Sequence, residues 1–174
     1  MRKTLIALVV AACAVAGLAG CAKSPYPSTW GPAATSSTAA PANQAEAYLA
    51  VLQHLYGADT GLNGDATFLA LDLSQVQLAD TAPLVALVRR FCADHGYTLL
   101  LDTFEGLQAK GYIKDLGFPD GFLISYTDVS LTADQLVTKA HKWRSGLGAI
   151  GGQYTVTRGA GGWSITSITG QWIS

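Results

Sequence analysis

The residue types of nucleophilic hydrolysis occur in this chain of 174 residues, but no spacing joins them into a motif. His141, with Asp128 and Ser145, supplies the types of a Ser-His-Asp triad, which is defined by geometry and not by sequence position. His54 and His95 are isolated, and no His-x-His pattern or pair of cysteines indicates zinc. Chemistry by His141 is therefore a hypothesis that depends on the fold.

The loop around Asp59 matches two functional patterns in part. Asp59-Thr60-Gly61 is the triplet of aspartic peptidases, whose mechanism needs two aspartates that share one proton, and the chain has one copy. It follows a predicted helix end, where these residues are typical of an Asx turn. Asp59, Asn63 and Asp65 also stand where a calcium loop has oxygen ligands, but Ala70 replaces its bidentate glutamate. These three residues are candidates for weak calcium binding; we predict no other metal and no cofactor.

The segment 146–151, Gly-Leu-Gly-Ala-Ile-Gly, fits the dinucleotide pattern G-x-G-x-x-G. That chemistry needs a strand before the glycines, a helix after them and an acid about twenty residues further on. Here a strand-like segment follows instead, and Gln171 stands near the position of the acid. The pattern therefore predicts a flexible glycine connection between strands, or a bulge where another backbone passes close.

A tryptophan between two cations is the densest group that no motif explains. Tryptophan and arginine are favoured anchors of interfaces, and a guanidinium can stack on an aromatic face. The candidate binding residues are these three and two aromatic residues that would line a pocket: Lys142, Trp143, Arg144, Tyr154 and Trp163. The alternative is that Trp143, Trp163 and Trp172 fill the concave side of a sheet as core residues.

The hydrophobic pattern indicates which elements must position these residues. Apolar residues at helical spacing, with caps and glycine stops, predict helices over 43–57, 80–96 and 104–110. Alternating or β-branched segments predict strands over 66–73, 97–101, 112–116, 122–129, 136–143, 154–158 and 163–173. Helices followed by a meander predict an α+β fold, with N-terminal helices packed on a curved antiparallel sheet of about four to six strands.

This order of elements, ending in Gly-Gly-Trp-Ser-Ile-Thr at 161–166, resembles the cone-shaped nuclear transport factor 2-like and cystatin-like folds over most of residues 43–174. A second resemblance covers about residues 80–130. The segment 104–113 and the Pro-Asp-Gly turn after it look like the recognition helix and wing of a winged-helix module. Its reading helix would carry Lys110 as its one basic residue, so such a module would be structural here.

The N-terminal segment has the organisation of an export signal. Arg2 and Lys3 precede an apolar stretch over 4–18, and Leu18-Ala19-Gly20-Cys21 closes it. The motif resembles the lipobox of bacterial lipoproteins. The resemblance implies a signal peptide over 1–20 and a mature protein that starts at Cys21 and carries acyl chains such as palmitate. The Pro-, Ser- and Thr-rich residues 21–42 would be a flexible tether, and residues 43–174 a single α+β domain.

The lipobox implies a location outside the cytoplasm, on the outer face of the plasma membrane or on an outer membrane facing the periplasm. The lipid bilayer is then one partner, through acylated Cys21; the others are an envelope protein, a glycan or a small molecule. Nucleic acid is excluded as a partner because the net charge is −1 and no basic cluster occurs. Cys92 would be the one thiol of the domain, and a buried inert side chain is its expected role.

Two functional hypotheses follow. The first is a binding or interaction module of the cell envelope, since no catalytic motif is intact beside the aromatic and cationic group. The alternative is a hydrolase acting on an envelope substrate, with an acid or base drawn from Asp59, Asp65, Asp128 and His141.

Overall fold

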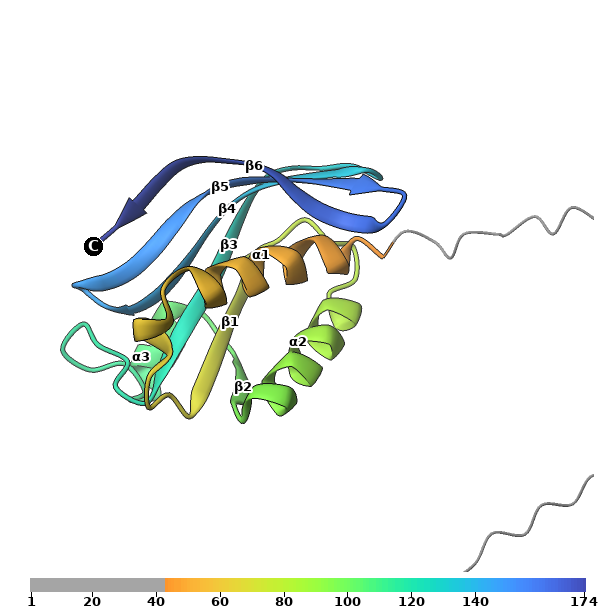
Figure 1. Ribbon diagram of the computed structural model, residues 1–174. Helices are drawn as coiled ribbons and strands as arrows, with labels where there is room; N and C mark the ends of the chain where they lie inside the picture. Colours follow the sequence, from red (N-terminus) through yellow and green to blue (C-terminus); the bar gives the residue numbers. More distant parts are fainter. Residues whose placement is uncertain (1–42) are drawn as a thin grey trace, which may run out of the picture. The chain divides into compact units, whose positions relative to one another are not determined.

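The computed structural model describes residues 43–174, so the predicted lipobox at 18–21, signal peptide over 1–20 and tether over 21–42 lie outside the described residues. Within 43–174 the chain forms three α-helices, one short 3-10 helix and six strands (Figure 1). In chain order these are α1 (Ala45–Ala58), η1 (Thr60–Asn63), β1 (Phe68–Gln75), α2 (Ala82–His95), β2 (Thr98–Leu101), α3 (Phe104–Ala109), β3 (Gly121–Leu131), β4 (Gln135–Ser145), β5 (Gly148–Gly159) and β6 (Gly162–Ile173). The predicted α+β class is confirmed.

The six strands form one open sheet in the order β2-β1-β3-β4-β5-β6. Neighbouring strands from β3 to β6 are antiparallel, as predicted for the meander. In contrast, β1 pairs in parallel with both β2 and β3. Parallel neighbours need a long crossover, and helix α2 provides it between β1 and β2. The sheet is therefore mixed at one end and antiparallel over the rest.

Each face of the sheet has a different cover. Helices α1 and α2 lie against one face (Figure 1), and their apolar sides join every second residue of β1, β3, β4 and β5 in the main core. Helix α3 and the loop 110–120 cover part of the opposite face with a smaller core, whose buried members are Ala70, Leu107, Ile113, Phe118 and Leu123. No helix of residues 43–174 covers the remainder of this second face. None of the described helices is long and apolar enough to cross a membrane.

Local signals account for most element ends. The Asp80 carboxylate accepts a hydrogen bond from the backbone N–H of Ala82 (2.9 Å) at the start of α2, and Gly96 (φ 78°) ends that helix. The prediction of an extended segment over 112–116 is wrong. This segment is a turn, in which Asp115 and Leu116 both have positive φ. The helix compared with a recognition helix ends at Ala109, after six residues.

The glycine-rich segment 146–152 is not a flexible connection, because β5 already begins at Gly148 and its next four residues are buried. The other interpretation, a bulge where another backbone passes close, is only partly right, because side chains approach Gly151 and the extra residue of the bulge is in β6. A Cβ atom on Gly151 would lie 2.7 Å from Cζ2 of Trp172 and 2.8 Å from Cβ of His141. The pairing of β5 with β6 also shifts between Gly151 and Gln153. Glycine at position 151 therefore makes room for a neighbouring side chain.

Candidate functional site

The tryptophan and the two cations predicted as one contact group do not share a surface. Successive side chains of β4 point to opposite faces of the sheet. Lys142 and Arg144 face α1 and η1, whereas Trp143 lies on the other face and packs edge-on against Phe104 (ring centroids 4.9 Å apart).

Lys142 is fully buried (0 % exposed), and its ammonium group contacts oxygen atoms of the last turn of α1 and of the loop after it. Nζ donates hydrogen bonds to the backbone oxygen of Asp59 (2.5 Å), to Oδ1 of Asn63 (3.0 Å) and to the backbone oxygen of Tyr56 (3.4 Å). Burial lowers the pKa of Lys142 to about 8. The ammonium group thus holds this loop in place through three hydrogen bonds.

This arrangement also explains the partial calcium pattern. The side-chain oxygen of Asn63 accepts a hydrogen bond from Lys142, and Asp65 is exposed and has φ 54°. Oδ1 of Asp59 accepts a hydrogen bond from the backbone N–H of Gly61 (3.1 Å), which is the predicted Asx turn. Nowhere in residues 43–174 do three or more His, Cys, Asp or Glu side chains group as they would around a metal ion.

Arg144 and the two aromatic candidates also have structural contacts. The guanidinium of Arg144 donates to the backbone oxygens of Pro119 (2.7 Å) and Leu62 (3.2 Å), and so fastens the loop after α1 to the turn before β3. Tyr154 is buried in the main core, and Trp163 packs half-buried against the same core. Both side chains therefore lie on the face covered by helices. For Trp163 this agrees with the alternative prediction that it is a core residue.

The four candidate acids and bases of a hydrolase do not meet in one cleft. Asp128 faces α1, where its Oδ2 accepts hydrogen bonds from the Tyr48 hydroxyl (2.5 Å) and the Gln77 backbone N–H (2.7 Å). Burial, followed by this hydrogen bond, raises the pKa of Tyr48. Asp59 and Asp65 belong to the loop after α1. His141 lies on the opposite face of the sheet, in a groove that none of the three aspartates lines.

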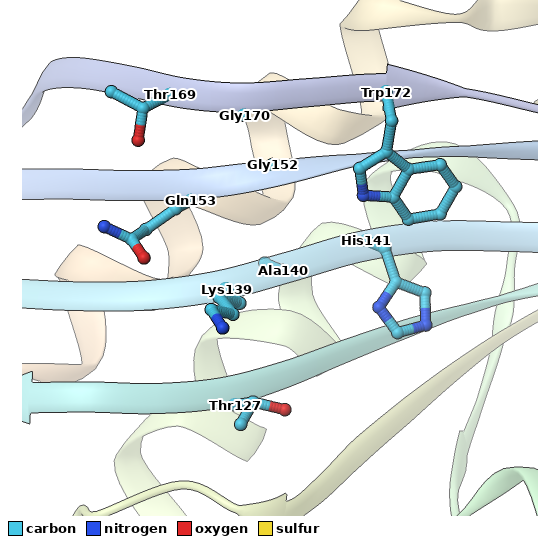
Figure 2. A pocket seen from close by; sticks show the side chains of 9 residues that line it. All are labelled: Thr127, Lys139, Ala140, His141, Gly152, Gln153, Thr169, Gly170 and Trp172. Carbon is cyan, nitrogen blue, oxygen red and sulfur yellow. The ribbon is translucent and has the colours of Figure 1, made fainter.

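That groove has a volume of about 430 Å³ and lies on the part of the sheet face that carries no helix (Figure 2). Its lining comes from four neighbouring strands, β3 to β6: Thr127, Lys139, Ala140, His141, Gly152, Gln153, Thr169, Gly170 and Trp172. In Figure 2 the middle of the groove, at Gly152 and Ala140, carries no long side chain, and the polar and aromatic side chains surround it.

Strand register arranges the side chains of the groove in two rows across the sheet. Directly paired residues share a face, and their side chains are neighbours. The first row is entirely polar and runs across β3, β4, β5 and β6: Thr127, Lys139, Gln153 and Thr169. The second row starts one strand earlier, at β1: Asp72, Ser125, His141, Gly151 and Trp172.

A bulge in β6 brings Trp172 into the second row. Gly151 pairs with Trp172 and Gln153 with Thr169, so two residues of β6 lie opposite the single residue Gly152. The first of them, Gly170, has φ 58°, which suits the left-handed position of a bulge. Without the extra residue, Trp172 would point to the face covered by helices. With it, the indole reaches from β6 across β5 toward His141 (Figure 2), and the ring centroids are 6.2 Å apart.

The order of the second row does not form a catalytic triad. In a triad the histidine lies between the serine and the carboxylate. Here Ser125 lies between Asp72 and His141, whose positions on β1 and β4 are two strand spacings, roughly 10 Å, apart. Burial lowers the pKa of His141, and the charge of Asp72 opposes that shift only in part. The imidazole is therefore neutral at pH 7.

The charge of the groove comes from Lys139. Lys139 makes no ion pair with any residue of 43–174, and no carboxylate lines the groove. Sequence reasoning missed Lys139, Gln153, Thr127 and Thr169, because single polar residues on a strand are common on any solvated face. The isolated glycine at 170 was the one local signal of a bulge that could have pointed to this region.

Cys92 is buried in the main core, where burial raises the pKa of its thiol to about 11. Against an ordinary pKa of 9.0, this lowers the thiolate fraction at pH 8 by roughly a hundredfold. We expect alkylation of Cys92 by iodoacetamide to be slower by about that factor in the folded protein than in urea. Mass spectrometry of the Cys92 peptide measures the rate, and equal rates in both states would show that the thiol is accessible.

No family model, curated protein or solved structure matches the chain in comparisons with known proteins.

Proposed function

We propose that the protein is a membrane-anchored extracytoplasmic lipoprotein, and that its α+β domain is a binding module of the cell envelope. Its ligand site is the groove that contains His141 and Trp172. One observation carries the proposal. Two cross-strand rows bring an indole, an ammonium group, an imidazole, an amide and two hydroxyl groups to a single open groove. Groups of this kind orient a bound molecule.

The position of the groove supports binding in two further ways. Its side chains project from four paired strands, so the backbone beneath them is held by the hydrogen bonds of the sheet. Neither α1 nor α2 lies over it, since both helices cover the opposite face. A ligand can therefore enter without a large rearrangement of the helices.

Binding is preferred to hydrolysis for a geometric reason. A hydrolase needs an acid or base within reach of a nucleophile or of an activated water. His141 is the one candidate in the groove, whereas Asp59, Asp65 and Asp128 lie elsewhere. The nearest carboxylate of its row, Asp72, is two strands away.

Anchoring is tested by the Cys21→Ser variant. Without the thiol, residue 21 cannot receive acyl chains, so the protein should lose metabolically incorporated palmitate. Cys92→Ser is the matched control, because the proposal gives that thiol no role in acylation. Retention of palmitate in Cys21→Ser would contradict the lipoprotein assignment.

Binding is tested by a photo-crosslinking residue placed at Thr169 on the rim of the groove. With isolated cell envelopes, a defined adduct should form at position 169 and be lost when Trp172 is also changed to Ala. The same crosslinker at Arg89, an exposed residue of α2, is the control for non-specific capture. Equal adducts at both positions would argue against the groove as the ligand site.

A further inference from the structure

The indole of Trp172 offers the groove an accessible aromatic platform. Its side chain is 45 % exposed, and the ring lies over Gly151 and beside His141. The π face of an aromatic ring is electronegative and attracts C–H groups that carry partial positive charge. A saturated ring with polarised C–H groups on one side, such as a pyranose, fits this platform.

The first row provides hydrogen-bonding groups beside the platform. The hydroxyls of Thr127 and Thr169 and the amide of Gln153 each donate and accept hydrogen bonds. Sugar hydroxyls also do both, so they can pair with all three side chains. An apolar ring would cover these groups without replacing the water that solvates them, which costs binding free energy.

Lys139 gives the groove a preference for negative charge. Its ammonium group has three donors and no acceptor, and no carboxylate lines the groove. Asp72 belongs to the second row but does not line the groove, and it lies on β1, two strands from His141. His141 is neutral at pH 7 and adds a ring nitrogen as hydrogen-bond partner, with no second positive charge.

From these three features together we infer that the groove binds an acidic saccharide, that is, a pyranose ring with a carboxylate. The ring stacks on Trp172, its hydroxyls pair with Gln153 and Thr169 on the neighbouring strands β5 and β6, and its carboxylate pairs with Lys139 on β4. A volume of about 430 Å³ is at the small end of the range of ligand pockets, and suits one or two sugar rings. This inference rests on the proposed function, because it names the ligand class of the same groove.

The test is an NMR titration of the full-length protein in detergent micelles with sodium glucuronate, glucose and sodium acetate. We expect saturable shifts of the Trp172 indole N–H and the Gln153 side-chain amide with glucuronate. Glucose should bind at least about fivefold more weakly, and acetate should give no saturable shift of the indole. Raising the salt from 50 to 500 mM should weaken glucuronate binding and leave glucose binding unchanged.

Two variants separate the contributions of the ring and the charge. Trp172→Ala should lower the affinity for glucuronate by about tenfold or more, because it removes the platform. Lys139→Gln should reduce glucuronate binding to the level of glucose and leave glucose binding unchanged. Lys114→Gln, on the exposed loop before β3, is the matched charge control and should bind as the parent protein does. Thermal unfolding checks that each variant is folded.

Each alternative outcome has a distinct meaning. Equal affinity for glucose and glucuronate, or glucuronate binding that survives Trp172→Ala, would overturn the assignment of an acidic saccharide to this groove. If no saccharide binds but the crosslinker at Thr169 still forms its Trp172-dependent adduct, the inference fails and the proposed binding function stands. If both the titration and the crosslinking fail, the groove is not a ligand site and both proposals fall.

Discussion

Lys142→Ala should lower the free energy of unfolding by about 3–5 kcal/mol at pH 7, as measured by urea denaturation. The substitution removes a fully buried side chain and leaves three oxygen atoms, one in the last turn of α1 and two in the loop after it, without their shared donor. Lys114→Ala, at an exposed position, is the control and should change stability by less than about 0.5 kcal/mol. A small effect of Lys142→Ala would mean that the loop does not need the ammonium group.

The pH dependence of stability tests the protonation state of Lys142. Its pKa is about 8 in the fold and 10.5 in the unfolded chain, so between these values the unfolded state binds more protons. The free energy of unfolding of the parent protein should therefore rise with pH above about 8, relative to Lys142→Met. Below pH 8 the difference in free energy of unfolding between the two proteins should be constant, because Lys142 is protonated in both the folded and the unfolded state.

The rise approaches about 3 kcal/mol by pH 10.5, at about 1.4 kcal/mol for each unit of pKa shift. Comparison with Lys142→Met removes the contributions of Cys92 and the buried tyrosines, which titrate in both proteins. These groups have raised pKa values, so each lowers stability as the pH rises above its ordinary value. A difference that stays flat from pH 7 to 10.5 would show that the Lys142 ammonium is well solvated.

Gly170→Val should remove Trp172 from the groove. Position 170 has φ 58°, a conformation that costs a residue with a Cβ about 1–2 kcal/mol and is least suited to a β-branched one. Loss of the bulge shifts the end of β6 by one residue, so that Gln171 takes the position opposite Gly151 and Trp172 turns to the other face. Glucuronate binding should then fall by tenfold or more, as in Trp172→Ala.

Gly170→Asn is the matched control, because asparagine tolerates the left-handed conformation better than other non-glycine residues. It should keep the bulge and bind glucuronate within about threefold of the parent protein. Nuclear Overhauser contacts between the Trp172 indole and the His141 ring report the position of Trp172 directly. Their persistence in Gly170→Val would show that the bulge does not depend on glycine.

Local signals in the sequence were sufficient for the helices and for the fold class. Apolar residues at helical spacing, Pro83 near the start of α2 and Gly96 at its end depend on interactions within a few residues, and all three are found as expected. The Asx turn from Asp59 to Gly61 is local in the same sense. The parallel pairing of β1 with β2 and β3 was missed, because strand neighbours are chosen by contacts between residues far apart in the chain.

Lys142 and Trp172 show where sequence patterns fail for a single residue. A lysine beside a tryptophan predicts an exposed contact. Strand alternation instead directs Lys142 toward backbone oxygens of Tyr56 and Asp59, and no sequence pattern indicates that these oxygens lie beside it. For Trp172, one extra residue in β6 decides which face of the sheet it meets. Period-two reasoning cannot assign the face of a residue beyond an unrecognised bulge.

The sequence by itself determined the α+β class, the three helices and most of the strands. It also predicts a lipid-modified Cys21. These properties depend on residue types within short windows. Only the tertiary structure decided that Lys142 is an internal ammonium group, and that Lys139, Gln153 and Trp172 share a groove with His141. The physical reason is that a groove on a sheet is built by register between strands, and register is set by core packing and bulges across the whole domain.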